Sequence, residues 1–352
     1  MVKVSSLAVL LMVGCSWMGN AESSTPSLMA RKSKQSWPGE GYHYVDPVFT
    51  AYHPGNFSIN TDPALIEAYA SLSADSGVDV ILLGGSTAEW PSLTASERLE
   101  ILAAWRAAVD KLPASKRPSI LFHVGDISIP AAQALSSKAE ELGADAILIV
   151  APCIMKPATL ESLAETIRDI AKMSTLPAVY YHYPSLYTVD FPMDAFLDLA
   201  SRSSSEYFIP TLAGVKYIDG NMKTLTNATG VAGGKFILFN NDPLLAGMAA
   251  GASGAISYTT LFPTVAAMHK AWASGDMDTA RAAQRRLLEA DALIGKYGGK
   301  SAARVLPALM AGMPNIDLGP PRPPLVGLDS DQVEEFRQAL KAHGFLRDGS
   351  EL

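Results

Sequence analysis

A regular alternation of two kinds of segment constrains the fold of this chain more than any other feature of its sequence. From about Tyr44 onward, short apolar runs of β-prone residues alternate with longer segments in which apolar residues recur at spacings of three and four. This is the pattern of parallel strand and helix units. Eight such runs predict an α/β fold, a closed (β/α)8 barrel (TIM barrel), rather than an open sheet. The predicted strands span residues 44–51, 78–84, 119–124, 146–151, 178–182, 214–217, 236–240 and 254–258.

The segments between these strands, and the chain after them, are helical in pattern. Thr94 and Glu97 form a capping box at the start of one predicted helix. The chain after residue 263 is rich in Ala and Leu and contains a Pro-rich break at 319–324. We therefore expect a barrel over 44–263 and a C-terminal helical extension over 264–352. The predicted helices between strands include residues 64–76, 95–111, 129–142 and 160–173.

The N-terminal residues form a separate region. Lys3 is followed by an apolar stretch at 4–14 and by small residues at 19–21, which is the layout of a signal peptide. We expect a signal peptide at 1–21, a linker at 22–43, and export of the protein to the periplasm or the cell exterior. The alternative is a misassigned start codon or a disordered extension, in which case the protein is cytoplasmic. No later segment is long and uncharged enough to span a membrane.

Composition excludes several classes of protein. The chain has 352 residues, of which 48% are hydrophobic, and this is too apolar for a disordered protein. With 28 basic against 35 acidic residues it offers no basic surface, so we expect no nucleic-acid partner. The two cysteines, Cys15 and Cys153, cannot build a disulfide framework, and the histidines lack the spacing of a helical zinc site, so we expect no metal. For Cys153, a small buried hydrophobe is favoured over a nucleophile.

In a barrel of this kind, reactive groups lie at the carboxyl ends of the strands. The second predicted strand is followed there by the sequence GSTAE at 85–89, whose backbone N–H groups and hydroxyls suit a turn that holds a carboxylate. An ordinary turn is the alternative. The fifth predicted strand ends in the sequence YYHY, in which Tyr181 and Tyr183 share one face by alternation. These tyrosines either relay protons or only pack.

Lys216 directly follows the apolar residues of the sixth predicted strand. Burial of a charged amine is costly, so the pKa of Lys216 should fall and the amine can attack a ketone to form a Schiff base. The alternative is a lysine whose ammonium reaches solvent at the end of the strand. The spacing alone leaves these two interpretations even.

Taken together, these strand ends resemble the class I, Schiff-base-forming pyruvate aldolases, the family that includes N-acetylneuraminate lyase and dihydrodipicolinate synthase. The resemblance extends from about Tyr44 to Phe345. Its densest parts are GSTAE at 85–89, GADAILIVAP at 143–152 with KP at 156–157, YHYP at 181–184, GVK at 214–216 and GASG at 251–254. Within the family, YYHYPSL at 180–186 and GPPRPPL at 319–325 look most like animal-type N-acetylneuraminate lyases.

The resemblance implies a role for each of four residues. Lys216 would form an imine with the C2 ketone of a 2-keto acid, and no separate cofactor would be needed because the protonated imine is itself the electron sink. Tyr181, with Ser86 next in the relay, would shuttle protons at the aldehyde oxygen. Backbone N–H groups of Ser86 and Thr87 would hold the carboxylate. The resemblance also implies a homotetramer.

Other positions depart from the patterns of the family. Leu186 stands where dihydrodipicolinate synthases carry an arginine for a second carboxylate, and residues 153–154 stand where they supply a tyrosine to a neighbouring subunit. The lyases' sugar-binding positions are altered as well. These altered positions, which we expect to contact the substrate, are Ile218, Asn241, Asp242 and Tyr258.

The sequence therefore predicts a carbon–carbon lyase that releases pyruvate from a 2-keto-3-deoxy sugar acid. N-acetylneuraminate, cleaved to N-acetylmannosamine and pyruvate, is the first substrate to expect. A lyase for another such sugar acid and a dihydrodipicolinate synthase-like enzyme are the alternatives within this class. A sugar-acid binding protein without turnover is the alternative of another class, and the presence of both Lys216 and Tyr181 favours the enzyme.

Overall fold

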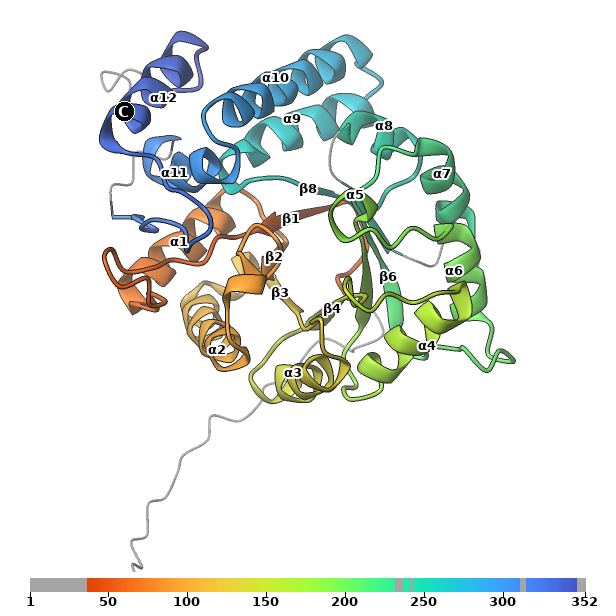
Figure 1. Cartoon of the computed structure of the whole chain (residues 1–352). Helices are drawn as coiled ribbons and strands as arrows, with labels where there is room; N and C mark the ends of the chain where they lie inside the picture. Colours follow the sequence, from red (N-terminus) through yellow and green to blue (C-terminus); the bar gives the residue numbers. More distant parts are fainter. Residues whose placement is uncertain (1–36, 232–236, 241–242, 311–314, 347–352) are drawn as a thin grey trace, which may run out of the picture. The chain divides into compact units, whose positions relative to one another are not determined.

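The computed structural model describes residues 37–231, 237–240, 243–310 and 315–346. Eight parallel strands close into a barrel in sequence order, with β1 paired to β8, and Figure 1 shows the helices outside the ring of strands. This confirms the predicted (β/α)8 barrel. The strands are β1 (His43–Pro47), β2 (Val80–Leu83), β3 (Ser119–His123), β4 (Ala146–Val150), β5 (Ala178–His182), β6 (Leu212–Tyr217), β7 (Ile237–Asn240) and β8 (Gly254–Ile256).

The helices follow the expected alternation, and α2 begins at the predicted capping box. The Thr94 hydroxyl accepts from the backbone N–H of Glu97, whose carboxylate accepts from the backbone N–H of Thr94. The helices are α1 (Pro63–Asp75), α2 (Ala95–Lys111), α3 (Ile129–Glu141), α4 (Leu160–Ala171), α5 (Pro184–Tyr187), α6 (Met193–Ser201), α7 (Met222–Gly230), α8 (Leu244–Ala249), α9 (Phe262–Ala273), α10 (Met277–Lys296), α11 (Lys300–Met310) and α12 (Ser330–Ala342).

The first, second and last strands are shorter than the sequence predicts, and β2 spans Val80–Leu83 rather than 78–84. After β1 ends at Pro47, the backbone turns away from β2, and the N–H of Tyr52 donates to the carbonyl of Leu318, 2.9 Å away. After β8 ends at Ile256, the chain enters a 3-10 turn at Thr259–Leu261. Both departures occur at the carboxyl ends of strands, where the chain leaves the sheet to build loops around the barrel mouth.

Side-chain alternation along the strands separates two apolar layers. Leu82, Leu121 and Leu148 belong to the cluster inside the barrel, whereas their neighbours Ile81 and Ile120 pack in the larger cluster between strands and helices. The strands approach closely at Gly254, where a Cβ atom would lie 2.5 Å from the carbonyl oxygen of His43. The inner cluster includes Tyr181, which lies near the carboxyl end of β5 at the barrel mouth.

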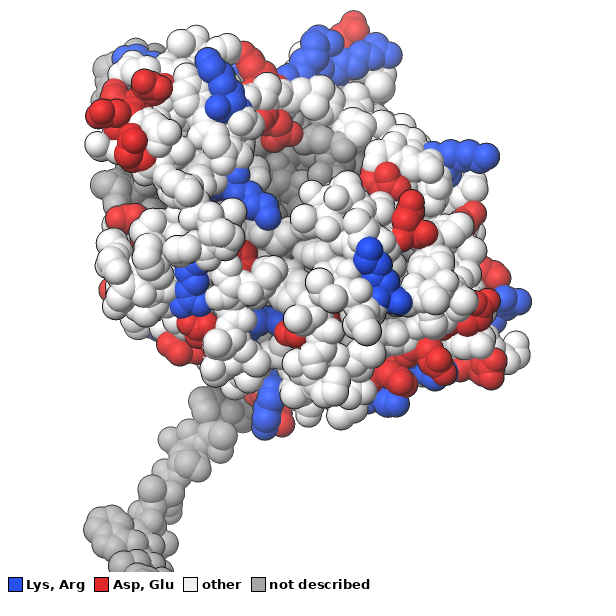
Figure 2. All heavy atoms as spheres, viewed as in Figure 1, with Lys and Arg blue, Asp and Glu red and all other residues white. Residues whose placement is uncertain are grey.

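The C-terminal helices contact one another in sequence order, α9 with α10, α10 with α11 and α11 with α12. The division into a barrel at 44–263 and an extension at 264–352 remains a prediction, and its boundary falls inside α9. Residues 1–36, which contain the expected signal peptide and most of the linker, lie outside the described residues. None of the described helices combines the length and hydropathy that crossing a bilayer requires. Figure 2 shows basic and acidic side chains interspersed over one face of the molecule.

Candidate active site

A pocket opens at the carboxyl ends of the strands and collects most of the side chains that the sequence singled out. Lys216 enters it from β6 and Tyr181 from β5, while Ser86 and Thr87 enter from the loop after β2. The other residues that line it are Pro47, Tyr183, Ile218, Ile256, Ser257, Tyr258 and Lys300. The predicted residues Asn241 and Asp242 lie outside the described residues.

The amine of Lys216 is buried at the base of this pocket. The residue is 3% exposed, and its Nζ lies 4.2 Å from the centroid of the Tyr181 ring. Burial, and next the positive charge of Lys300, lower the pKa of Lys216 from its ordinary 10.5 to about 7. Because a large fraction of the amine is neutral near neutral pH, Lys216 has the properties of a nucleophile toward a carbonyl carbon.

Tyr181 lies beside Lys216 because the two residues are register partners in the pairing of β5 with β6. Its hydroxyl is 3.1 Å from the hydroxyl of Ser86, and either oxygen can donate. Burial raises the pKa of Tyr181 above its ordinary value, so the phenol stays protonated. A protonated phenol bonded to a second hydroxyl can pass a proton in either direction without carrying a charge.

The alternation predicted for β5 is confirmed. Tyr183 lines the pocket with Tyr181, whereas Tyr180 packs on Phe196 of α6, with ring centroids 4.9 Å apart. His182 stacks on Tyr217, with centroids 5.4 Å apart, and does not line the pocket. The imidazole therefore contributes to packing outside the barrel, and the phenols on the inner face define the site.

The loop after β2 is fixed at three successive points. The carbonyl of Ser86 accepts from the Nζ of Lys300 at 2.8 Å, and the carbonyl of Ala88 accepts from the hydroxyl of Thr50 at 2.9 Å. Glu89 adopts a left-handed conformation with φ of 60° and is buried. Its carboxylate accepts from Arg304 and from the backbone N–H of Arg322, each at 3.0 Å. The turn that carries Ser86 and Thr87 is thus held in one geometry.

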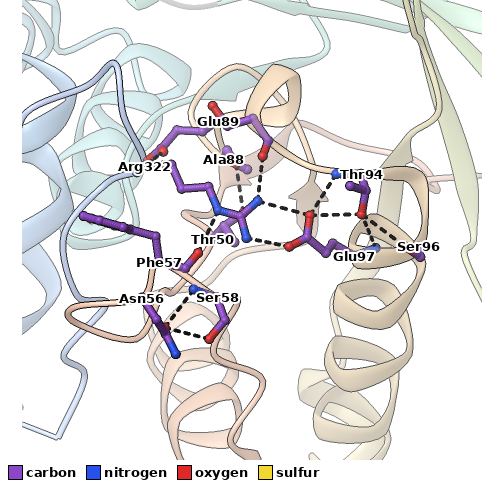
Figure 3. A network of polar contacts seen from close by, with 11 residues as sticks. Thr50, Asn56, Phe57, Ser58, Ala88, Glu89, Thr94, Ser96, Glu97 and Arg322 are labelled. Atoms are coloured by element: carbon purple, nitrogen blue, oxygen red, sulfur yellow. Dashed lines mark hydrogen bonds and ion pairs between the residues drawn. The ribbon is translucent and has the colours of Figure 1, made fainter.

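Arg322 links Glu89, in the loop after β2, to Glu97 of α2, as Figure 3 shows. Its guanidinium donates to the carboxylate of Glu97, in the first turn of α2, and to the carbonyl of Phe57. The hydrogen bond from Arg322 is the main reason that the pKa of Glu97 falls to about 2. Burial instead raises the pKa of Glu89, although Arg304 opposes this shift. The segment before α12 is thereby tied to the middle of the loop that follows β2 and to the first turn of α2.

Several residues around the site were not found from the sequence. Lys300 lies at the start of α11, far along the chain from the other residues of the pocket. Behind Tyr181, the indole N–H of Trp90 donates to the hydroxyl of Tyr187 at 2.9 Å. No local motif marks any of these residues, and only the closed barrel brings them together.

Two further predictions concern the surroundings of the pocket, the role of Cys153 and the expected absence of a metal. Cys153 is a free, partly buried cysteine that packs against the inner apolar cluster and does not line the pocket. Within the described residues there is no group of three or more His, Cys, Asp or Glu side chains that could hold a metal ion. Among the described residues that line the pocket, the groups that can do chemistry are two amines, phenols and hydroxyls.

A (β/α)8 barrel with a buried amine of lowered pKa beside a phenol at its mouth has the features of a Schiff-base-forming enzyme. The chain belongs to the dihydrodipicolinate synthetase family, whose model matches residues 48–343. Members of this family are carbon–carbon lyases that form a Schiff base with a lysine and need no cofactor.

The relatives of this chain include both N-acetylneuraminate lyases and 4-hydroxy-tetrahydrodipicolinate synthases. N-acetylneuraminate lyase of Mus musculus is 29% identical over 286 residues, which cover 79% of this chain and 86% of that protein. 4-Hydroxy-tetrahydrodipicolinate synthase of Moorella thermoacetica is 29% identical over 282 residues, covering 79% and 90%. The structure of Proteus mirabilis N-acetylneuraminate lyase has a TM-score of 0.78 at 24% identity, covering 87% of this chain and all of that one. These values support the aldolase family and the fold.

Proposed function

We propose that this protein is an aldolase that releases pyruvate from a 2-keto-3-deoxy sugar acid, with N-acetylneuraminate as the first substrate. The observation that carries this proposal is the buried amine of Lys216, 4.2 Å from the Tyr181 ring centroid in an open pocket. A protein that only bound sugar acids would gain nothing from burying an amine there, because burial costs free energy unless the neutral amine is used.

In the proposed reaction, Lys216 attacks the C2 ketone and water leaves as the imine forms. Electrons of the C3–C4 bond move into the protonated imine, which yields an enamine of pyruvate and an aldehyde at C4. The C4 hydroxyl gives up its proton to the Tyr181 hydroxyl, which passes its own proton to the Ser86 hydroxyl and from there to solvent. The enamine then takes one proton at C3 through the same relay, which restores the protonated imine, and water hydrolyses this imine to release pyruvate and the amine.

The side chains beside the amine bear on the choice of substrate. Ile218, Tyr183 and Tyr258 line the pocket, and Ile218 offers no hydroxyl to a sugar. Leu186, in α5, is 47% exposed and carries no charge for a second carboxylate. This favours a sugar acid over the substrate of a dihydrodipicolinate synthase. A sugar acid with a hydroxyl pattern other than that of N-acetylneuraminate is the second candidate.

A panel of 2-keto sugar acids, assayed for pyruvate release, tests this proposal. We expect turnover of at least one 2-keto-3-deoxy sugar acid and none by the Lys216→Ala variant. Condensation of pyruvate with aspartate semialdehyde, in the absence of any sugar-acid cleavage, would instead assign a dihydrodipicolinate synthase-like reaction. Binding of the sugar acids without release of pyruvate would assign a binding protein.

Two further proposals concern the whole protein. We propose that it is exported by the signal peptide at 1–21, and N-terminal sequencing of the native protein tests this. A mature chain that begins near residue 22 would support export, and one that begins at Met1 would refute it. We also propose a homotetramer, which sedimentation analysis tests, and a monomer in solution would refute it.

A further inference from the structure

We propose that Lys300 is a substrate-binding residue whose ammonium is the counter-charge for the carboxylate of the keto acid. This inference rests on the proposed function, because it assigns a partner to the keto acid that Lys216 attacks. It is separate from the hydrogen bonds that the N–H groups of Ser86 and Thr87 are expected to give. It predicts that charge recognition in the pocket depends on α11, beyond the last barrel strand.

The position of Lys300 places its charge at the carboxylate-binding turn. Its Nζ donates to the carbonyl of Ser86 at 2.8 Å, and the residue lines the same pocket as Lys216 and Tyr181. An ammonium has three N–H donors, so two remain after the bond to Ser86. An oxygen anion bound at the turn is thus within reach of a charge-assisted hydrogen bond from Lys300.

The negative charge of Glu89 acts on Lys300, but the two side chains form no ion pair in the described part of the chain. None of the ion pairs found there includes Lys300, while Glu89 nearby is paired with Arg304 at 3.0 Å. In the pocket, the positive charge of Lys300 lowers the pKa of Lys216, which shows that the two amines are electrostatically coupled. The described lining of the pocket contains no carboxylate. An anionic substrate would therefore be the group that forms a direct ion pair with Lys300.

Helix stability does not explain a lysine at this position. Lys300 is the first residue of α11, an 11-residue helix. The N-terminus of a helix carries partial positive charge, so a cation there is unfavourable by some tenths of a kcal/mol, whereas an acidic residue would be favourable. A positive charge kept at an unfavourable helix end, and aimed at the pocket, fits binding of an anion.

The test compares two keto compounds that differ in charge, pyruvate and its uncharged methyl ester. The rate of imine formation is measured by trapping with cyanoborohydride and mass spectrometry, for the wild type and for Lys300→Met. We expect the wild type to prefer pyruvate and the Lys300→Met variant to lose this preference by about 10- to 100-fold, the range expected for one charge-assisted hydrogen bond. Any change in the reactivity of Lys216 affects both compounds and cancels in the ratio.

Lys296→Met is the matched control. Lys296 lies in the last turn of α10, with Nζ 5.0 Å from the Tyr297 ring centroid, and does not line the pocket. This variant should keep the wild-type ratio, and Lys300→Arg should keep most of the preference because it keeps the charge. An unchanged ratio in Lys300→Met would overturn the inference, as would a wild type that traps both compounds equally well. Absence of any adduct with the wild type would instead refute the proposed function.

Discussion

The pH dependence of imine formation follows directly from the environment of Lys216. With its pKa lowered from 10.5 to about 7, roughly half of the amine is neutral at pH 7. An ordinary lysine would be neutral in about one molecule in 3,000 at that pH, so the pocket increases the reactive fraction on the order of a thousandfold. The rate of imine formation at low pyruvate concentration should therefore rise with pH and level off above about pH 7 to 8.

The assay is cyanoborohydride trapping of the pyruvate adduct between pH 5 and 10, scored by intact mass. Pyruvate remains ionised over this range, so the acidic limb reports the free enzyme. Because Lys300 is the second cause of the lowered pKa, Lys300→Met should move this limb to higher pH. A limb near the ordinary lysine pKa in the wild type would refute the reasoning, since the amine would then be protonated and solvated in solution.

Three substitutions test other parts of the site. Tyr181→Phe should keep adduct formation but slow cleavage of the sugar acid by about 10²- to 10⁴-fold, and an equal loss in both steps would show that the phenol only shapes the pocket. Lys216→Met should abolish turnover and raise the free energy of unfolding in urea by about 1–4 kcal/mol at pH 7, because the unfolded lysine binds a proton more tightly than the buried amine does. This gain in stability should shrink as pH rises from about 7 toward 10.5. A destabilised variant would contradict the lowered pKa. Glu89→Gln should lower kcat/KM and cost about 2–4 kcal/mol of stability, because it leaves Arg304 without its charged partner. Glu97→Gln also weakens an ion pair to the C-terminal segment, but it should leave kcat/KM close to wild type. Equal effects of the two variants on kcat/KM would show that Glu89 does not position the turn.

Much of the barrel could be predicted from the sequence because its signals are local. The period of the apolar residues locates each strand, and the start of α2 is set by side chains three residues apart, Thr94 and Glu97. That Tyr181 and Tyr180 lie on opposite faces follows from strand alternation, whereas the structure shows that Tyr181 is the inner one. The ends of β1, β2 and β8 were predicted less well, and these predicted strands ran too long.

The electrostatics of the site could not be predicted in the same way, because they depend on distant segments. The bond from Lys300 to Ser86 joins residues 214 positions apart, and the pair of Arg304 with Glu89 joins residues 215 apart. Sequence spacing left the interpretation of Lys216 even, and it is the burial seen in the closed barrel that favours the nucleophile. The resemblance pointed to the candidate reacting residues, whereas the charges that surround them could be found only from the fold.

Reductive trapping with pyruvate, followed by peptide mapping, tests the central claim most directly. We expect a single pyruvate-derived modification, on Lys216, and none in the Lys216→Arg variant. Lys300 should stay unmodified. A modification on another lysine, or none on the folded wild-type protein, would contradict the assignment of Lys216 as the amine that attacks the substrate.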